Sequence, residues 1–577
     1  MNKNWLILPQ IDREFIKKFP EYSRVVLQLL YNRGLKEKEE IEAFLNPDCA
    51  ENGYDPFLFQ NMRAAVELII EHIKKAHFIV VYGDFDADGV TASAILAETL
   101  STLKADVDVY IPDRASEGYG LNNQAIDLLA QAGAKLIITV DNGIRGKDEV
   151  EYAKSLGIDV IITDHHQPSE DESELPDCLI INPMAKGEKY PFKYLAGVGV
   201  AFKLAKALIG EAKLEESVKR KLEENILDLA AIGTVADCVT VLGENRIIIK
   251  EGLKIINKQN RVGLDELIKQ AQINGRIDAW NIGWQIAPRL NAAGRLEHAN
   301  TAFELLTTKN KQEAQAIAAR LNDKNIERQK ITNEIAEYCR QVVEKELGDD
   351  KILILADPAI ISGANSWPEG VIGLVAGRLC EQYNRPVLVI TQGHGEIKGS
   401  GRSIEEFNII KALEEVKEFF LRFGGHAQAC GFTLKSKDNL PDFVGKMKRI
   451  ADTILKDIDL RPRVVVEAEL DLEEVSEELI KDTEKFAPFG EDNERPRFAS
   501  RNVAIRDIMT MGIDGRHVKF RMGNFWAVAF NQAETWQDLR IGDKIDIVYY
   551  VEMNEFNGRR EAQLKVVDIK HNANTTN

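Results

Sequence analysis

Residues 78–90 read FIVVYGDFDADGV, and this stretch decides the fold of the first half of the chain. The apolar run Phe78–Tyr82 has the length and composition of a buried strand. Asp84, Asp86 and Asp88 follow at alternate positions, and the apolar spacing of Thr91–Leu103 predicts a helix behind them. Three carboxylates therefore stand at the end of a buried strand, where they repel one another unless a cation neutralises them.

Further apolar runs continue this pattern downstream. Leu136–Val140, Val160–Thr163 and Leu179–Ile181 predict short buried strands, while Asn122–Ala132 and Lys147–Leu156 have the spacing of crossover helices. Strands that alternate with helices predict a β-α-β-α-β unit with a parallel sheet. Ligands of such sheets bind beyond the carboxyl ends of the strands, so we expect the chemistry at that edge.

Two other strand ends carry the same kinds of side chain. The second strand ends in ITVDNG with Asp141, and the third ends in ITDHH with Asp164, His165 and His166. Because parallel strands bring their carboxyl ends to one edge, we expect these groups to meet the first three acids. Asp237 follows a largely apolar helix, and it is either a further member of this site or a surface residue at a helix end.

The acidic loop taken alone also fits a solvated turn or a calcium loop, which has the spacing Asp-x-Asp-x-Asp-Gly. A calcium loop needs Glu six residues beyond the Gly, and that position is Ile95, inside the apolar helix. Carboxylates with imidazole and no thiolate favour Mn²⁺ or Mg²⁺, and the imidazole favours Mn²⁺. Two such ions can activate water and hold both oxygens of a phosphoryl displacement, so the motifs predict metal-assisted phosphoester hydrolysis.

The 577 residues are enough for several domains. Lys309–Leu347 contains neither Gly nor Pro and predicts one long helix, about 58 Å at 1.5 Å per residue. Lys351–Ala356 and Pro386–Thr391 alternate with helical stretches and predict a second α/β domain. From about Arg463 onward, short strands with turn signals predict a small β-barrel, with Asn557-Gly558 as one hairpin turn.

Composition places the chain among globular proteins, with 44% hydrophobic and 29% charged residues. No apolar run reaches the roughly 18 residues that span a bilayer. No cleavage signal follows the N-terminus either, so we expect a cytoplasmic protein without a membrane segment. The six cysteines are far apart and form no C-x-x-C pair, which predicts reduced thiols and neither disulfides nor a zinc site.

Charge is unevenly distributed along the chain. The net charge of −18 argues against wholesale wrapping of nucleic acid, but residues 495–530 contain seven Lys/Arg and two Asp/Glu, a local net charge of +5 (7 − 2). Basic and aromatic side chains alternate there, as in an OB-fold that pairs backbone charge with base stacking. We expect Phe520 in the barrel core. The basic residues are Arg497, Arg501, Lys519 and Arg521, and the aromatic ones are Phe498, Phe520, Phe525 and Trp526.

The motifs GDFDADG, VDNG, TDHH and VADCV, in this order, resemble those of the DHH phosphoesterase superfamily. The similarity extends from about residue 50 to about residue 570, is strongest to the single-strand-specific exonucleases of that superfamily, and includes PDRASEGYG, APRLNAAGR, KGSGRS, GGHAQACGF and FAPFGEDNERPRF. It implies an α/β fold: a DHH parallel-sheet domain joined by a long helix to a smaller α/β DHH-associated domain, plus a C-terminal OB-fold β-barrel. The implied divisions are an N-terminal helical segment (1–55), the DHH domain (56–308), the connecting helix (309–347), the DHH-associated substrate-binding domain (348–460) and the OB-fold nucleic-acid-binding domain (461–577).

The same resemblance implies roles for single residues. Asp141 would bridge two divalent metal ions, His166 would face the scissile phosphate, and Asp88 would complete the catalytic set with these two. Many members have His where this chain has Tyr82, so one metal would rely on Asp84 instead. The implied metal ligands are Asp84, Asp86, Asp88, Asp141, His165 and Asp237.

Other implied residues would hold the terminal phosphate and the strand beside the metals. Glycines let the backbone approach an anion, and Arg holds phosphate with a planar fork. These residues are Arg114, Ser400, Arg402, Gly424, Gly425 and His426, with Lys519 and Arg521 on the barrel. Taken alone, KGSGRS and GGHAQACGF also fit an ordinary hairpin and a helix boundary. Arg289 and Arg295 either line the same path or form salt bridges between lobes.

The implied activity is a divalent-metal-dependent exonuclease that degrades single-stranded DNA from its 5′ end to mononucleotides, in DNA repair and recombination. We expect a monomer whose partners are single-stranded DNA, a helicase and a single-strand-binding protein. Two alternatives stay open: another DHH phosphoesterase that acts on short oligonucleotides, and a non-catalytic DHH scaffold of a replication complex. The nearly complete set of Asp and His residues argues against the scaffold.

Overall fold

The computed structural model describes residues 3–47, 53–114, 116–362, 366–393, 395–512, 514–556 and 559–571. The chain divides into two compact units. One consists mainly of residues 288–462, and the other contains most of the remaining chain.

A parallel sheet forms the centre of the larger unit. Its strands are β2 (Phe78–Tyr82), β3 (Asp106–Tyr110), β4 (Ala134–Val140), β5 (Asp159–Thr163) and β6 (Leu179–Ile181). Their order is β3-β2-β4-β5-β6, and every neighbouring pair is parallel. The apolar runs predicted as strands are therefore strands, with their carboxyl ends at one edge of the sheet.

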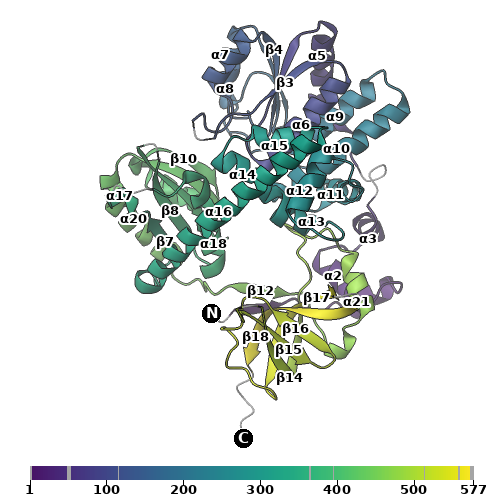
Figure 1. The fold of residues 1–577 in the computed structure, drawn as a ribbon, viewed down its shortest axis with the longest axis vertical. Helices are drawn as coiled ribbons and strands as arrows, with labels where there is room; N and C mark the ends of the chain where they lie inside the picture. Colours follow the sequence, from purple (N-terminus) through teal and green to yellow (C-terminus); the bar gives the residue numbers. More distant parts are fainter. Residues whose placement is uncertain are drawn as a thin grey trace. The chain divides into compact units, whose positions relative to one another are not determined.

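Helices cover both faces of this sheet, which explains why β2, β4 and β5 are almost wholly apolar. The helices are α5 (Met62–Lys74), α6 (Ala87–Thr102), α7 (Asn123–Gln131), α8 (Lys147–Ser155) and α9 (Gly197–Glu211). In Figure 1, α7 and α8 lie on one face of the sheet, and α5, α6 and α9 lie on the other.

Two details of this sheet differ from the sequence prediction. The edge strand β3 was not predicted, because its sequence DVDVY alternates charged and apolar residues and is only partly buried. Helix α6 begins at Ala87 rather than Thr91, since the side chain of Asp86 caps it by accepting from the backbone N–H groups of Asp88 and Gly89. The third acid of the loop is thus in the first turn of a helix.

A helical layer packs beside α6 and α9. It contains α10 (Glu216–Ala236), α11 (Gly243–Ile256), α12 (Val262–Gln270), α13 (Ala279–Asn281) and the π-helix η3 (Ile282–Ile286). The C-terminal half of α10 is buried, and the helix ends with Asp237 as its C-cap, as the sequence predicted. Close packing of α10 is possible because Gly233 faces Thr91, Val198 and Asp88, where an added Cβ would come within 2.8 Å of each.

The smaller unit surrounds a second, mixed sheet. Its strands are β7 (Leu353–Ala356), β8 (Val387–Gly393), β9 (Glu396–Arg402), β10 (Phe420–His426) and β11 (Ala429–Leu434), in the order β10-β11-β9-β8-β7. Its helices are α14 (Ala287–Leu296), α15 (Asn300–Thr307), α16 (Lys311–Glu346), α17 (Ala359–Ser362), α18 (Glu369–Tyr383), α19 (Ile409–Glu414) and α20 (Leu440–Ile454). The long helix predicted over residues 309–347 is α16.

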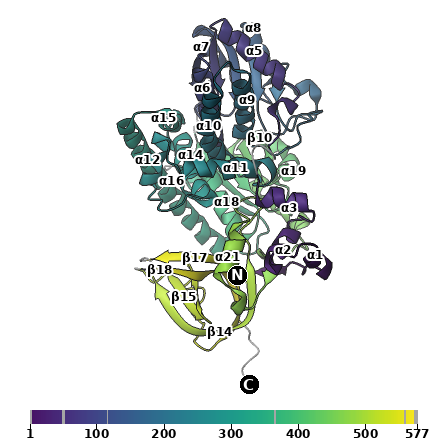
Figure 2. The same cartoon turned by 90° about the vertical axis from the view of Figure 1, so that its right-hand side faces the viewer.

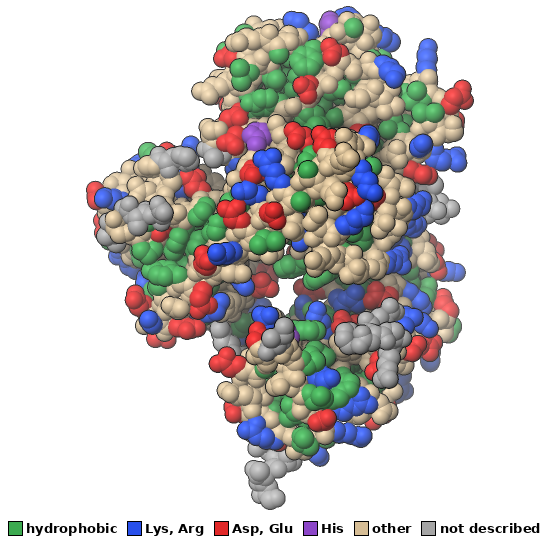
Figure 3. Space-filling model, in the orientation of Figure 1, with side chains coloured by type: hydrophobic (Ala, Val, Ile, Leu, Met, Phe, Trp, Pro, Cys, Tyr) green, Lys and Arg blue, Asp and Glu red, His purple; other side chains and the backbone are tan. Residues whose placement is uncertain are grey.

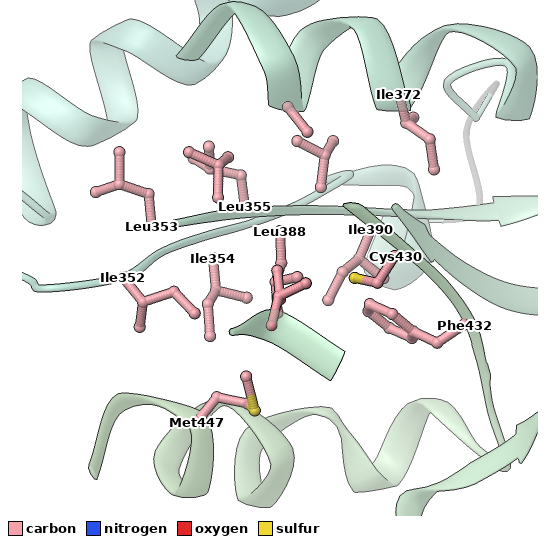
Figure 4. Close-up of a cluster of buried hydrophobic side chains, with 14 of the residues drawn as sticks. Ile352, Leu353, Ile354, Leu355, Ile372, Leu388, Ile390, Cys430, Phe432 and Met447 are labelled. Carbon is pink, nitrogen blue, oxygen red and sulfur yellow. The ribbon is translucent and has the colours of Figure 1, made fainter. Parts of the chain in front are cut away.

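Alternating side chains of β7 and of Ile352, the residue before it, supply both layers of this core. In Figure 4, Leu353 and Leu355 point toward α18, which carries Ile372. Ile352 and Ile354 point the other way, toward Met447 of α20, and all of these side chains are buried. The sheet is therefore covered on both faces, as its apolar composition predicts.

The C-terminal strands curl into a barrel (Figure 2). They are β13 (Ala468–Glu469), β14 (Phe498–Met511), β15 (His517–Met522), β16 (Phe525–Ala529), β17 (Lys544–Phe556) and β18 (Arg559–His571). Their order is β13-β14-β15-β16-β18-β17, and pairing of β14 with β17 closes the sheet. Phe520 is fully buried in the barrel core, as predicted. The predicted turn at Asn557-Gly558 lies outside the described residues.

The N-terminal segment packs onto the barrel. Helices α1 (Arg13–Lys18), α2 (Arg24–Asn32) and α3 (Lys38–Leu45) share a buried core with the barrel strands and α21 (Glu477–Glu484). The purely helical prediction for this segment was wrong in one respect, because β1 (Asn4–Ile7) pairs with β12 (Arg463–Val466). The short 3-10 helices are η1 (Pro56–Leu58), η2 (Glu172–Glu174), η4 (Lys417–Phe419), η5 (Lys437–Asn439) and η6 (Leu472–Glu474).

None of the described helices is long and apolar enough to cross a membrane. The described cysteines carry free thiols, as predicted, and Cys49 lies outside the described residues.

Candidate metal centre and nucleic-acid surface

The first acidic loop is shaped by its own glycine and by the start of α6. Asp86 Oδ1 accepts from the backbone N–H groups of Asp88 (2.9 Å) and Gly89 (3.1 Å). A Cβ on Gly89 would lie 2.6 Å from the backbone of Asp84, so only glycine lets the loop fold this tightly. The loop therefore holds all three carboxylates close together at the end of β2.

The N-terminus of α9 packs against the acids of two strands. The backbone N–H groups of Gly197 and Val198 donate to the two carboxylate oxygens of Asp88, at 2.7 and 2.9 Å. A Cβ on Gly197 would come within 2.5 Å of Asp141 Oδ1. Asp141 itself is 2% exposed and has φ +63°, a conformation that Asp adopts more readily than most residues. Sequence reasoning missed Gly197 and Val198, because only the fold brings them to the acids.

The third strand end contributes both histidines. His165 Nε2 lies 3.2 Å from Asp141 Oδ1 and 3.6 Å from Asp237 Oδ2. Among the described residues, Asp and His side chains form three groups, and within each group the ligand atoms all lie within 4.8 Å of one another. The groups are Asp84, Asp86 and Asp141; Asp88, His165 and Asp237; and Asp141, His165 and His166. Every residue predicted as a metal ligand therefore belongs to one continuous cluster.

Asp164 was identified in the sequence without a role, and the structure shows what it touches. Its Oδ1 lies 2.8 Å from His166 Nδ1 and also accepts from the backbone N–H groups of His165 and His166. Its Oδ2 accepts from the backbone N–H of Ile144. Although burial opposes ionisation, these hydrogen bonds and the charge of His166 lower the pKa of Asp164. The hydrogen bond and the charge of Asp164 in turn raise the pKa of His166 against the effect of burial.

Four other carboxylates of the cluster are buried beside like charges. Burial, followed by repulsion from neighbouring carboxylates, raises the pKa of Asp84, Asp141 and Asp237 well above the ordinary value. The same causes raise the pKa of Asp88 from 3.8 to about 7. Asp84 Oδ1 and Asp141 Oδ1 are buried and accept no hydrogen bond from the described residues. This set of carboxylate and imidazole donors fits one or more hard divalent cations.

Tyr82 is fully buried. Its hydroxyl donates to the carbonyl of Gly120 (3.1 Å) and accepts from the side chain of Asn122 (3.1 Å). Asp84, in contrast, is grouped with Asp86 and Asp141.

Two residues of the PDRASEGYG motif lie beside the cluster. The guanidinium of Arg114 stands over the ring of Phe85 at 4.8 Å and contributes to the electrostatic environment of Asp84. The hydroxyl of Tyr119 donates to the carbonyl of Asp141 (3.0 Å) and lies 3.2 Å from His166 Nδ1. Tyr119 is half exposed and was missed, although the motif that contains it was recognised.

Comparison with known proteins identifies the family. The model of the DHH family, N-terminal domain, matches residues 78–234, the DHHA1 domain matches residues 356–453, and the RecJ OB domain matches residues 466–568. The single-stranded-DNA-specific exonuclease RecJ of Bacillus subtilis strain 168 is 39% identical over 568 residues, which cover 96% of this chain and 70% of that protein. The chain belongs to the RecJ family.

Solved RecJ structures share this fold. The crystal structure of RecJ in complex with Mn²⁺ from Thermus thermophilus has a TM-score of 0.82 and 29% sequence identity, and covers 98% of this chain and 79% of that chain. The corresponding complex with Mg²⁺ has a TM-score of 0.77 and 28% identity, with 98% and 78% coverage.

In the DHHA1 domain of this RecJ-family chain, Ser400 and Arg402 lie on β9 and face α18. Ser400 Oγ donates to the carbonyl of Cys430 (3.3 Å), and one guanidinium nitrogen of Arg402 donates to the carbonyl of Gly401 (2.9 Å). Gly373 of α18 leaves room for Ser400, because a Cβ there would lie 3.0 Å from Ser400 Oγ, whereas the Arg402 guanidinium would stay at an ordinary contact distance of 3.8 Å. GGHAQACGF is a β10–β11 hairpin rather than a helix boundary.

The hairpin carries the other predicted phosphate-binding residues of this domain. Gly424, Gly425 and His426 are exposed on β10, the edge strand of the sheet. Gly425 has φ +139° and packs against the carbonyl of Ala429. An exposed edge with two glycines leaves the backbone accessible, which suits contact with an anion.

Arg289 and Arg295 lie on α14 and make contacts inside the smaller unit. Arg289 Nε donates to the side chain of Asn322 (3.1 Å) on α16. Arg295 donates to the carbonyl of Gly370 (2.7 Å) on α18. These two contacts are hydrogen bonds within one unit and are not salt bridges between lobes, so they decide neither of the two roles expected for these residues.

The RecJ OB domain uses fewer of its basic residues on an open surface than the sequence suggested. Four of the seven Lys/Arg of residues 495–530 form ion pairs with Asp or Glu. Arg495 pairs with Glu484, Arg497 with Glu494, Arg501 with both Glu469 and Asp546, and Arg516 with Asp514. Arg497 and Arg501 are thus held by acids, contrary to the expectation from their spacing. Figure 3 likewise shows Lys and Arg interspersed with Asp and Glu over the face in view.

Lys519 and Arg521 instead lie with an aromatic residue. Lys519 Nζ stands 4.4 Å and Arg521 Cζ 5.5 Å from the ring of Trp526, which pairs with Arg521 across β15 and β16. All three side chains are partly exposed on the outer side of the barrel. A pair of cations around one indole has the chemistry that binds the backbone and bases of a single strand.

Proposed function

We propose that this RecJ-family chain is an exonuclease specific for single-stranded DNA and dependent on divalent metal ions. The observation that carries the proposal is the cluster at the carboxyl edge of the parallel sheet, in a chain 39% identical to a curated exonuclease of this specificity. The raised pKa values of its acids and the hydrogen-bond acceptors left without donors support a cation in that place.

Two ions fit the donor set best. We assign Asp84, Asp86 and Asp141 to one ion and Asp88, His165 and Asp237 to the other, because each group brings its ligand atoms together. Asp141 is close to donors of both groups, which supports a bridging role. Such ions would activate water and hold the reacting oxygens. The imidazole favours Mn²⁺ over Mg²⁺.

The protein side chains complete the catalytic arrangement. Asp164 fixes the ring of His166 and favours its charged form, so His166 can face the scissile phosphate as a cation. Asp88, held by the N-terminus of α9, and Asp141 are the other catalytic residues of the proposal. The hydroxyl of Tyr119 contacts the main-chain carbonyl of Asp141 and the ring of His166, and would help to hold both residues in place.

The 5′-to-3′ polarity, with mononucleotides as products, is proposed from the resemblance to RecJ alone. With that polarity, Arg402, Ser400 and Arg114 would anchor the terminal 5′-phosphate. The exposed edge strand with Gly424, Gly425 and His426 would contact the adjoining backbone, and Lys519 and Arg521 would hold the strand on the barrel. Arg289 and Arg295 stay candidates for the same path. The division into domains at residues 55, 308, 347 and 460 is part of this proposal.

The cellular setting is proposed from the activity alone. A nuclease that accepts only single strands needs a helicase to supply them and meets single-strand-binding protein on them. Work in DNA repair and recombination, a monomeric state and a cytoplasmic location are the corresponding expectations.

One experiment tests the activity against its rivals. End-labelled single- and double-stranded DNA and RNA are incubated with the chain in Mn²⁺, Mg²⁺ or EDTA. Hydrolysis of single-stranded DNA to mononucleotides, lost in EDTA, supports the proposal. Preference for two- to five-residue oligonucleotides would favour the phosphoesterase alternative. Binding of DNA without metal-dependent hydrolysis would favour the scaffold and overturn the proposal.

A further inference from the structure

Asp237 is the member of the cluster that comes from the C-terminal end of a helix rather than from the end of a β-strand or the start of α6. Asp237 caps α10, and the chain then crosses residues 238–242 to reach α11. Cys238 has φ +58°, so the turn directly after Asp237 is in a conformation that L-residues rarely adopt. Such a turn keeps its shape only when surrounding contacts hold it.

At Val241, four residues after Asp237, the loop meets a segment about 250 residues later in the sequence, Lys485–Asn493, which precedes the barrel strand β14. The backbone N–H of Val241 donates to the carbonyl of Glu491 (3.0 Å). Gly490 packs against Val241, and a Cβ at Gly490 would lie 2.7 Å from Val241 Cγ1. The loop that carries Asp237 is thus seated on this segment by a hydrogen bond and by a contact that requires glycine.

Arg246 anchors the same segment to the first turn of α11. The residue is 2% exposed, and its guanidinium donates to main-chain carbonyls at 2.8–3.5 Å. One of these carbonyls belongs to Phe44, and the other four belong to Lys485, Phe486, Ala487 and Pro488. Because a planar fork with five donors matches this ring of acceptors, a smaller cation cannot satisfy all of them.

The other end of the segment is fixed to the barrel. The side-chain amide of Asn493 donates to the carbonyls of Phe486 and Pro488. Arg33 donates to Asn493 Oδ1 (2.8 Å) and forms a nearly buried ion pair with Glu467, at 2.7 Å. The segment is therefore connected through Asn493 and Arg33 to Glu467, which directly precedes the barrel strand β13.

We infer that the segment Lys485–Asn493 positions Asp237 and so completes the ion site formed by Asp88, His165 and Asp237. The barrel region is then a structural part of the metal centre as well as a surface that holds DNA. This inference rests on the proposed function, since it assigns Asp237 to a metal ion. It also predicts that deletion from residue 461 onward harms hydrolysis of short oligonucleotides, because the support of Asp237 is lost together with the barrel.

The test uses full-length protein and a compensating pair of variants. Gly490→Ala adds a Cβ that pushes Val241 away, and Val241→Ala in the same chain removes the methyl groups it meets. Gly210→Ala, near the end of α9, is the matched control, because a Cβ there would meet no heavy atom of the described residues within 4 Å apart from its chain neighbours and the backbone of its own helix. Mn²⁺ binding is measured by calorimetry without DNA, and kcat and KM are measured on a short oligonucleotide over a range of Mn²⁺ concentrations.

We expect two classes of Mn²⁺ site in the native chain and in Gly210→Ala. Gly490→Ala should weaken one class at least tenfold and leave the other within threefold. Its kcat should recover at high Mn²⁺ with KM unchanged, and Val241→Ala should restore binding in the double variant. If Gly490→Ala is not folded by circular dichroism, Arg246→Lys tests the same support and should also weaken one class selectively.

Three other outcomes would count against the inference or its premise. Unchanged Mn²⁺ binding in a folded Gly490→Ala or Arg246→Lys would overturn it, and so would equal weakening of both classes of site. Absence of Mn²⁺ binding by the native chain would instead contradict the proposed function.

Discussion

The surface formed by Lys519, Arg521 and Trp526 predicts how strongly salt weakens DNA binding. Two cations within 5.5 Å of one indole can neutralise two phosphates while a base stacks on the ring. Each phosphate neutralised on a single strand contributes about 0.7 to the slope of log affinity against log salt concentration. The double variant Lys519→Gln/Arg521→Gln should therefore lower the slope by about 1.4.

The magnitude follows from that slope. Between 50 and 200 mM salt, log salt concentration changes by about 0.6, so the native chain should lose about sevenfold more affinity than the variant over this range. Binding of a labelled single strand is followed by fluorescence anisotropy in EDTA, which prevents hydrolysis. Lys481→Gln/Lys544→Gln removes the same charge from exposed positions away from Trp526 and should leave the slope unchanged. An equal decrease of the slope in both double variants would show that only total charge matters and would refute the assignment of this surface.

Three further predictions concern the centre and the end of the strand. Asp141→Asn keeps the size and the left-handed backbone of a 2%-exposed residue but removes its charge. Turnover with Mn²⁺ should fall at least about a hundredfold, while the melting temperature in EDTA should rise. A variant with more than about a tenth of native turnover would contradict the bridging role. The pKa of Asp88 is raised from 3.8 to about 7 in the folded chain, so the folded state holds this proton more tightly than the unfolded state. The metal-free chain should therefore lose stability as pH rises from about 4 to about 7. Denaturant unfolding in EDTA measures this loss, which should be smaller in Asp88→Asn; stability that rises equally with pH in both chains would contradict it. Arg402→Ala removes charge-assisted hydrogen bonds of about 1.5–3 kcal/mol each. The value of kcat/KM should therefore fall at least tenfold on a 5′-phosphorylated strand and much less on a 5′-hydroxyl strand. Equal losses on both strands would place Arg402 elsewhere on the DNA path.

The fold was predictable where burial is complete and hidden where it is partial. Strands β2, β4 and β5 are covered by helices on both faces, so their sequences are continuous apolar runs that stand out without any partner in view. Strand β3 lies at the sheet edge and alternates Asp with Val, and β1 is four residues long, so neither gives such a run. The sequence signal of a strand thus reports its environment more than its backbone conformation.

The centre was predictable for a different reason. Parallel topology brings the ends of all strands to one edge, so residues that follow strands can be placed together from the order of the strands alone. The rule covers Asp84, Asp141 and His165. It does not cover Tyr119, or Gly197 at the start of α9, because these approach the site from a loop and a helix whose packing only the folded chain determines.

Charge was the property that the sequence described least well. The window 495–530 has a net charge of +5, yet Arg501 meets Asp546 and Glu469, and Arg495 meets Glu484, all from outside that window. A count along the chain cannot include partners that folding brings from other segments, so it overstates the charge offered to DNA. We therefore expect DNA to contact the cations that share an aromatic neighbour rather than an acid. For this reason the expected change of slope corresponds to two phosphates rather than five.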